Sequence, residues 1–454
     1  MANDTSSAAT KSQAVPPRKG YNNIGDPVIW GIYVSLVLIS LLESFSSSGQ
    51  MIKSAHMYAP IFKHAILLAV GFGILLIIHL TNYKRFPLYI MLFALGTLVM
   101  LILAPFIGEE KNDATRSINL GFFSIQPAEM AKVAIVALIA WITARFQVKN
   151  DVQNKGVIIC AILVLFYSGF TFLQGLTNTI LLMGISFIMF IISGTKIKKI
   201  IAIIGVYAIA ALLFYSIKSY NDERVENLKK SDPAYVAKVE VKTDEFANDN
   251  EFVKFVSSFG RGGTWIARIV RHYTPPALVE QEITQENKQE MFARMAQAHS
   301  NIIGVGPGNS RECSRLPLAF SDYIYSIIVE ELGVLGGLFV LILFLALMFR
   351  AKKIADDCSY ALPAFLVLGM ATLISMQAFF HMAINTGVIP VSGQPLPLIS
   401  MGGTSCLMIS MAFGVILSVS RYSIKNAQDK ELKKIEREQL PEDLRAENPL
   451  IHNN

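Results

Sequence analysis

The sequence predicts an all-α polytopic membrane protein with about ten transmembrane helices and one large extracytoplasmic loop. Composition supports this class, because hydrophobic residues make up 53% of the 454 residues and charged residues only 16%. Soluble domains have about a quarter charged residues. The arrangement of basic residues supports it too, since they gather in alternate short loops between apolar segments, as is typical of membrane proteins with several spans.

Each transmembrane helix needs about 20 mostly apolar residues. Two expected helices, 156–173 and 177–194, are short and nearly continuous, so a re-entrant pair is an alternative there. The expected spans are 28–48, 60–81, 86–107, 127–146, 156–173, 177–194, 199–217, 322–349, 361–386 and 396–420.

Lysine and arginine in the short loops predict the orientation, because cytoplasmic loops carry an excess of both. The other short loops carry only Lys53, Lys111 and Arg116. The loop 218–321 therefore faces outward. The basic loop residues are Lys84, Arg85, Arg145, Lys149, Lys155, Lys196, Lys198, Lys199, Arg350, Lys352 and Lys353.

Both tails are basic next to the membrane, so we expect both termini in the cytoplasm. The first residues are polar and contain no short apolar run before the first span, so we expect no cleaved signal peptide. The chain then divides into a cytoplasmic N-terminal tail at 1–27, a membrane domain at 28–421 and a cytoplasmic C-terminal tail at 422–454.

The outer loop 218–321 changes character along its length. Its first half, 221–250, is dense in charge and expected to be solvated. From Phe252 the loop is amphipathic, with aromatic and aliphatic residues between arginines. Such a segment either lies on the outer leaflet near anionic headgroups or packs on the protein's own helices. Residues 277–298 predict a helix.

The end of this loop contains the most informative stretch of the chain. It reads GVGPGNSRECSRLPLAFSDYIYSIIVEELGVLGG and runs from a glycine-rich loop into an apolar helix. Asp322 lies where the two meet, so water can reach its carboxylate at the depth of the lipid headgroups. An aspartate before a helix is also a common N-cap, and Ser321 could serve equally well in that position.

Charged residues within spans are costly and tend to mark function. Glu129 and Lys132 lie three residues apart on one helical face, either as a structural pair or as part of a site. Glu330 and Glu331 follow Asp322 on its helix, and either line a cavity or make capping contacts. Arg116 opposes the charge bias of the outer loops, which makes it a candidate for anion binding.

A second irregular stretch, NTGVIPVSGQPLPLISMGGTS at 385–405, lies between the last two spans. Irregular backbone at membrane depth is tolerated where it is buried in protein or lines a cavity. Its backbone amides could bind an anion such as phosphate. We therefore take Ser400, Gly402 and Gly403 as candidate binding residues, with a simple tight turn as the alternative.

Several other classes of function are not indicated. No His, Cys and Asp cluster has metal-ligand spacing, and no phosphate-binding loop, dinucleotide fingerprint or nucleophile elbow occurs in the sequence. Cys160 and Cys406 fall in apolar spans, so a disulfide framework is not expected. The net charge of +6 comes from short loops, so nucleic acid is not an expected partner.

The two irregular stretches, together with RSINLGFFSIQPAEMAK at 116–132, resemble the signature regions of the SEDS family (shape, elongation, division and sporulation). This family contains the membrane peptidoglycan glycosyltransferases FtsW and RodA. The resemblance covers nearly all of 28–421. The GPGNS run followed by SDYIY lies closer to the FtsW branch, which implies a role in cell division and a place in the cytoplasmic (inner) membrane at the septum.

The resemblance implies polymerisation of lipid II outside the membrane, with inversion and loss of undecaprenyl pyrophosphate. Asp322 would be the general base. No cofactor is certain, although a divalent cation such as Mg or Mn is compatible with a pyrophosphate. Expected partners are a class B penicillin-binding transpeptidase and divisome membrane proteins. The substrate-binding candidates are Arg116, Glu129, Lys132, Arg311, Arg315, Glu330, Ser400, Gly402 and Gly403.

Two rival functions use the same residues. A lipid II flippase or transporter would bind the same lipid with the same intramembrane charges, and a non-enzymatic division scaffold would use the tails and helices to recruit a transpeptidase. The chain also departs from the family pattern. Ser117 and Met401 stand where aromatic residues are common, and the run 174–179 lacks the acid that the family has at that turn.

Overall fold

The computed structural model describes most of the membrane domain. The amphipathic segment that begins at Phe252 and most of both tails lie outside the described residues, so those expectations stay predictions. The described residues are 24–48, 59–107, 109–111, 114–119, 124–210, 212, 216, 283, 287–316, 319–390, 392–422, 438 and 440–442.

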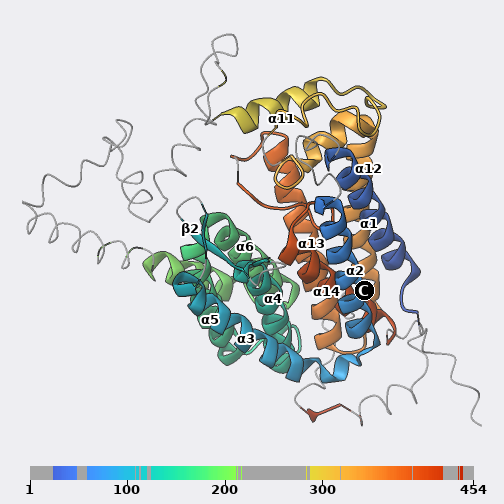
Figure 1. Ribbon diagram of the computed structural model, residues 1–454. Helices are drawn as coiled ribbons and strands as arrows, with labels where there is room; N and C mark the ends of the chain where they lie inside the picture. Colours follow the sequence, from blue (N-terminus) through green and yellow to red (C-terminus); the bar gives the residue numbers. More distant parts are fainter. Residues whose placement is uncertain are drawn as a thin grey trace, which may run out of the picture.

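The protein is mostly helical (Figure 1), and this confirms the predicted all-α polytopic class. Residues 197–210 are also helical and continue toward residues that are not described. The remaining helices are α1 (Pro27–Ser48), α2 (Ala59–Leu80), η1 (Tyr83–Arg85), α3 (Phe86–Ile107), α4 (Pro127–Arg145), α5 (Asn154–Gln174), α6 (Leu176–Ile192), α11 (Lys288–Ala298), α12 (Ile324–Asp356), α13 (Ala361–Asn385) and α14 (Gly403–Ser420).

Eight helices in the described part are long and apolar enough to cross a membrane, compared with the ten expected. The difference lies between α5 and the outer loop. The apolar helix α6 has 17 residues, slightly fewer than a typical span. The helix at 197–210 runs up to residue 211, which is not described, so its full length is not defined. The segment Asn154–Phe172 of α5 is itself long enough to cross, so α5 does not need the re-entrant alternative.

Two predicted helix boundaries were wrong. The last span was expected to begin at residue 396, but α14 begins at Gly403. Residues 396–400 are buried and irregular, and Leu398 has a left-handed backbone with φ of 63°. A bulky residue adopts this conformation only where its surroundings fix it. The predicted helix at 277–298 begins, in the described part, only at Lys288.

Three helices form the buried centre of the bundle. Nearly all of α4 is buried, as is most of α13 and α14, whereas α1, α2, α3, α5 and α12 keep large apolar surfaces exposed. In α4 the small residues Ala131, Ala134 and Ala140 are fully buried, which allows close helix packing in a membrane. Gly369 of α13 lies against Val136, where an added Cβ would approach Val136 Cγ1 to 2.7 Å.

Two small antiparallel sheets were not predicted. The first has the order β1 (Glu109–Lys111), β2 (Ala114–Asn119), β3 (Ser124–Ile125) and lies in the loop between α3 and α4. Its register pairs Ile118 with Ile125. The second sheet joins β4 (Gln147–Val148) to β5 (Asp151–Val152). Both are too short to change the fold class.

Helix α12 is broken at Gly333, whose backbone has φ of 74° and ψ of −177°. The loop before the helix supplies the missing hydrogen bonds. The amides of Val305 and Gly306 donate to the carbonyls of Glu330 and Glu331 at 3.0 and 2.8 Å. The amide of Val334 donates to the carbonyl of Asn301 at 3.1 Å. The loop and both halves of α12 are therefore held as one unit.

Contacts between distant segments define two ends of the bundle. At the basic end, Arg350 Nη2 lies 2.6 Å from Asp26 Oδ2, and Lys199 Nζ lies 2.9 Å from Asp151 Oδ2. Arg421 also donates to the carbonyl of His79 at 2.8 Å. We call the opposite end, formed by β1–β3, α11 and residues 299–323 and 386–402, the loop end. The basic short loops thus do lie together, as their charges predicted.

Candidate active site

Asp322 lies in the turn before α12 at the loop end, and its side chain is partly buried. Ser321 Oγ donates to Asp322 Oδ1 at 3.0 Å. The N-cap of α12 is Tyr323 rather than Asp322. At this terminus the amide of Ser326 donates to Asn385 Oδ1 of α13 at 3.1 Å. The N-cap position, which was the alternative role for Asp322, is therefore held by the next residue, Tyr323.

The structure brings the two irregular stretches of the sequence into contact. Ser400 Oγ donates to the carbonyl of Ser321 at 2.7 Å, and the amide of Met401 donates to the carbonyl of Phe320 at 3.0 Å. At Gly393 an added Cβ would lie 3.0 Å from Asp322 Oδ2. The segment 392–402 thus passes next to the Asp322 carboxylate, and the missing side chain of Gly393 leaves room for it.

The three candidates for anion binding in this segment have different surroundings. Ser400 is buried, and its hydroxyl accepts from the amide of Leu396 at 2.7 Å. The amide of Gly402 donates to the carbonyl of Ser400 at 2.7 Å, so it does not point outward as the sequence suggested. Gly403 is the first residue of α14 and is partly exposed. Ser400 therefore holds the Asp322 turn in this conformation.

Lys132 and Glu129 form a buried ion pair, with Nζ and Oε1 2.7 Å apart and side chains 1% and 3% exposed. Lys132 Nζ also donates to Gln377 Oε1 at 3.2 Å and to Gln394 Oε1 at 3.4 Å. An ammonium group has three donors, and here all three have acceptors. The lysine thus connects α4 to α13 and to the irregular segment.

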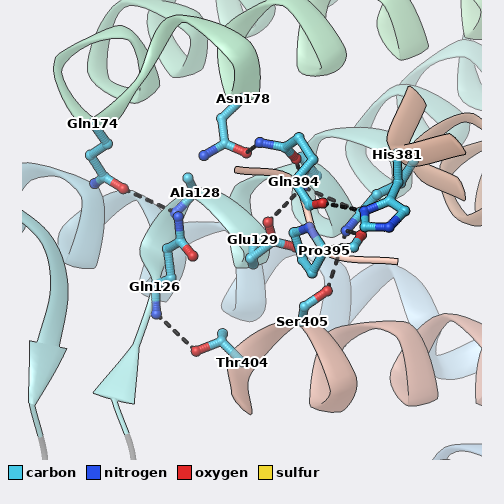
Figure 2. A network of polar contacts seen from close by, with 12 residues as sticks. Gln126, Ala128, Glu129, Gln174, Asn178, His381, Gln394, Pro395, Thr404 and Ser405 are labelled. Atoms are coloured by element: carbon cyan, nitrogen blue, oxygen red, sulfur yellow. Dashed lines mark hydrogen bonds and ion pairs between the residues drawn. The ribbon is translucent and has the colours of Figure 1, made fainter. Parts of the chain in front are cut away.

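The polar contacts continue from Lys132 toward Asp322, and Figure 2 shows the part of them around Gln394. Gln394 Nε2 donates to Asn178 Oδ1 of α6 at 3.0 Å, while the carbonyl of Gln394 lies 2.6 Å from His381 Nδ1. Asn385 Nδ2 lies 3.2 Å from His381 Nε2 and donates to the carbonyl of Asp322 at 3.1 Å. A continuous network of buried polar groups therefore links Lys132 to the backbone of Asp322.

Most of this network was not predicted from the sequence. Gln377, His381 and Asn385 are spaced by four residues, which places them on one face of α13. That spacing of polar residues in an apolar helix is the signal in the sequence from which this part of the network could have been predicted. Gln394 was hidden by the glycines and prolines around it.

Glu330 and Glu331 hold the glycine-rich loop. Both side chains are fully buried. Glu330 accepts hydrogen bonds from Ser310 Oγ and, at 2.9 Å, from the amide of Arg311. Glu331 accepts from Ser46 Oγ and from the amide of Gly308 at 3.1 Å. These contacts agree with the capping alternative for both residues, and a role of Glu330 in substrate binding stays a prediction.

The three candidate arginines lie on outer segments. Arg116 belongs to β2, and its side chain lies outside the described part. Arg311 and Arg315 are exposed in the loop before α12, with Arg315 Nη1 3.6 Å from Glu312 Oε1. Their role in binding a substrate stays a prediction.

Cys313 lies in the same loop and is buried. Burial raises the pKa of its thiol to about 12, and the negative charges of Glu331, Glu43 and Glu330 act in the same direction. A nucleophilic cysteine needs a lowered pKa. Cys313 is therefore a packing residue, and the carboxylate of Asp322 is the better candidate for chemistry at this end.

Among the described residues, no group of three His, Cys, Asp or Glu side chains could hold a metal ion. Side chains alone therefore form no site for a divalent cation in this part of the chain. Mg²⁺ is commonly held by one or two carboxylates together with the phosphates of a substrate. Asp322 could supply the protein carboxylate of such a site, and the remaining ligands would have to come from the phosphates of the substrate. The divalent cation therefore stays a prediction.

These features define a polytopic membrane protein whose buried polar network reaches the backbone of Asp322 at the loop end of the bundle. The family model described as cell cycle protein, FTSW_RODA_SPOVE, matches residues 27–235 and 279–425. The chain belongs to this family.

Similar proteins agree with this assignment. A protein named probable peptidoglycan glycosyltransferase FtsW from Geobacter sulfurreducens is 27% identical over 400 residues, 87% of this chain and 95% of that protein. Stage V sporulation protein E of Bacillus subtilis is 26% identical over 403 residues, covering 86% and 96%.

Two solved structures share the fold. One is a chain of a peptidoglycan synthase complex, with a TM-score of 0.61 and 18% identity over 88% of this chain and 99% of that one. The other is RodA of Thermus thermophilus, with a TM-score of 0.56 and 17% identity over 88% and 98%.

Proposed function

We propose that the chain is a peptidoglycan glycosyltransferase that polymerises lipid II at the outer face of the cytoplasmic membrane during cell division. The relatives named as probable peptidoglycan glycosyltransferases support the activity. The observation that carries the proposal is the meeting of Asp322 with segment 392–402, because it places a partly exposed carboxylate beside an irregular backbone at one membrane face.

Asp322 acts as the general base in this proposal. It takes the proton from the 4-hydroxyl of the acceptor sugar while that oxygen attacks the anomeric carbon of the chain on undecaprenyl pyrophosphate. The bond from the anomeric carbon to the phosphate oxygen breaks with inversion, and the pyrophosphate leaves with the electron pair. A carboxylate is a weak base, so proton removal is concerted with attack, and general-base catalysis contributes about 10²–10⁴-fold.

The growing charge of the pyrophosphate needs cations. Arg116, Arg311 and Arg315 are the proposed partners on the outer segments. Lys132 has its three donors directed at protein acceptors, so it contributes its positive potential and the orientation of Gln394 rather than a direct contact. A divalent cation bound with the pyrophosphate would add further charge neutralisation, with Asp322 as the protein ligand.

The partner and the orientation are also proposals. One solved structure with this fold belongs to a peptidoglycan synthase complex that coordinates polymerisation and crosslinking. We therefore propose a class B penicillin-binding transpeptidase as partner, with other divisome proteins at the septum. The basic end faces the cytoplasm together with both termini, because basic loops favour that side.

Single cysteines test the orientation, because the four native cysteines are all buried. Ser314→Cys lies at the loop end and Lys196→Cys at the basic end, both at exposed positions. An impermeant thiol reagent should label Ser314→Cys in intact cells and Lys196→Cys only after the membrane is opened. The reverse labelling pattern would show that the loop end faces the cytoplasm, which would contradict polymerisation at the outer face of the membrane.

Purified protein in lipid vesicles, alone and with the transpeptidase, tests the activity when lipid II is added. Glycan polymer is the expected product. Translocation of lipid II without polymer would favour the flippase or transporter, and neither result would favour the scaffold. Asp322→Asn is the matched control, because it keeps the size of the side chain and removes the base.

A further inference from the structure

His381 lies at the middle of the polar face of α13, four residues after Gln377 and four before Asn385. All three side chains are buried. Gln377 accepts from Lys132 Nζ, and Asn385 donates to the carbonyl of Asp322. His381 therefore lies between the residue that contacts the lysine and the residue that holds the aspartate.

The hydrogen bonds of His381 define its tautomer. Nδ1 lies 2.6 Å from the carbonyl oxygen of Gln394, which can only accept, so Nδ1 carries the hydrogen. Nε2 is then the acceptor for Asn385 Nδ2, which is 3.2 Å away. The neutral ring thus joins the irregular segment to the end of α13 with one donated and one accepted bond.

Both groups that His381 contacts are connected to the site. Asn385 Nδ2 also donates to the carbonyl of Asp322 at 3.1 Å, and Asn385 Oδ1 accepts from the amide of Ser326 at 3.1 Å. The side chain of Gln394 accepts from Lys132 Nζ. Gly393, the residue before Gln394, lies against the carboxylate of Asp322.

We infer that His381 is a positioning residue that fixes the segment at Gln394 against the turn at Asp322, and so sets where the base stands relative to Lys132. This inference rests on the proposed function. Without the imidazole, the Gln394 carbonyl loses its donor, while Asn385 Nδ2 keeps the carbonyls of Asp322 and residue 381 at 3.1 and 3.0 Å. The segment at Gln394 is then free to shift, and Gly393 moves relative to the carboxylate. A displacement of about 1 Å from the reactive geometry can cost about 10²-fold in rate.

The competing explanation is that His381 only stabilises the fold. The two explanations differ in what the loss of the ring changes. A residue that only stabilises alters the amount of folded enzyme, while the enzyme that remains folded reacts at the normal rate. A positioning residue alters the rate constant of the folded enzyme.

Single-turnover kinetics separate these effects. With the full chain and its transpeptidase in saturating excess over lipid II, the rate constant reports the chemistry of the folded enzyme. The folded fraction of each variant is measured separately by size-exclusion chromatography. His381→Phe keeps the size and removes both hydrogen bonds. His381→Asn places a side-chain amide N–H near the position of Nδ1 and keeps the bond to Gln394.

The matched control is Ser375→Ala. Ser375 is buried on the same helix and donates to the carbonyl of Phe344 at 3.2 Å, so this variant also removes one buried hydrogen bond of α13, but away from Asp322. It should alter the melting temperature and leave the rate constant unchanged. Thermal unfolding of all variants is measured in the same detergent.

We expect His381→Phe to lower the single-turnover rate constant by about 10–100-fold with little change in KM for lipid II, and His381→Asn to recover most of that loss. A normal rate constant with only a reduced folded fraction in His381→Phe and His381→Asn would overturn the inference. Wild-type protein that makes no polymer would overturn the proposed function itself and this inference with it.

Discussion

The two ends of the helix bundle use charge in different ways. At the basic end, ion pairs such as Asp151–Lys199 join short loops and are partly exposed. At the loop end the ion pair Glu129–Lys132 is buried and continues into a network of amides that reaches Asp322. Exposed pairs contribute little to stability, whereas a buried network must be fully satisfied. The charges of the basic end therefore predict the orientation of the protein, and the loop end is where we propose that the reaction takes place.

The largest effect should follow from changing the base at the loop end. Asp322→Asn and Asp322→Ala should lower polymerisation by at least about 10²-fold, because each removes the group that accepts the proton. Insertion and melting temperature should change little, since the carboxylate is only partly buried. Polymer length on gels and initial rates with lipid II are the measurements, and near-normal polymerisation by Asp322→Asn would refute the mechanism.

The buried ion pair comes next. Lys132→Met leaves the Glu129 carboxylate buried without its ammonium, which should cost about 3–5 kcal/mol of stability. The double variant Glu129→Gln/Lys132→Met removes both charges and should recover most of that loss. If the charge of Lys132 assists the leaving group, the double variant stays slow although it is stable. A stable double variant with wild-type turnover would make the pair purely structural.

Exchanging the two residues sharpens this test. The variant Glu129→Lys/Lys132→Glu keeps an ion pair at the same spacing but moves the ammonium by one turn, away from Gln377 and Gln394. We expect a folded protein with reduced turnover, measured by the same assay. A folded and fully active exchange variant would contradict any role of the lysine beyond pairing.

A third prediction concerns the glycine-rich loop. At Gly304, with φ of 87°, an added Cβ would lie 2.3 Å from the carbonyl oxygen of Glu331. Gly304→Ala should therefore cost about 3 kcal/mol through strain and overpacking. Gly308 has a similar φ of 81° with nothing within 4 Å, so Gly308→Ala should cost only about 1 kcal/mol. Equal melting temperatures would contradict the close contact between loop and helix.

The smallest effect is expected at the basic end. Partial burial of Asp151 opposes ionisation, but Lys199 and Lys196 outweigh it and lower the pKa of the carboxyl. A lowered pKa means that the carboxylate stabilises the folded state above the usual value of about 3.9, and that this contribution is lost as the pH falls through the folded pKa.

Asp151→Asn should therefore cost less than about 1 kcal/mol at neutral pH. Its melting temperature should converge with that of the wild type as the pH falls below the lowered pKa of Asp151. Melting curves across pH measure this, and a constant difference at all pH values would show that the effect is not electrostatic.

The sequence predicted what depends on composition and on local pattern. Apolar length predicted the helices, loop charge predicted which loops lie together, and the breakers around Asp322 predicted an irregular site. The sequence could not predict which carboxylate becomes buried under which loop. Glu330 and Asp322 lie eight residues apart, yet one holds the loop and the other is partly exposed. That difference arises from tertiary contacts of residues 301–311.

The network around Gln394 was unpredictable for a related reason. Its partners come from α4, α6 and α13, so no local pattern shows that one glutamine connects them. The start of α14 was misjudged because the apolar residues 396–399 look helical in composition. Their backbone is determined instead by contacts with the Asp322 turn.

The break in α12 has a consequence for how the protein is made. A membrane helix normally carries all of its own backbone hydrogen bonds into the bilayer. Here the carbonyls of Glu330 and Glu331 and the amide of Val334 take theirs from residues 301–306. If the helix entered the lipid before this loop docked, each unpaired group would cost several kcal/mol. Insertion of this span is thus coupled to translocation and docking of the segment synthesised just before it.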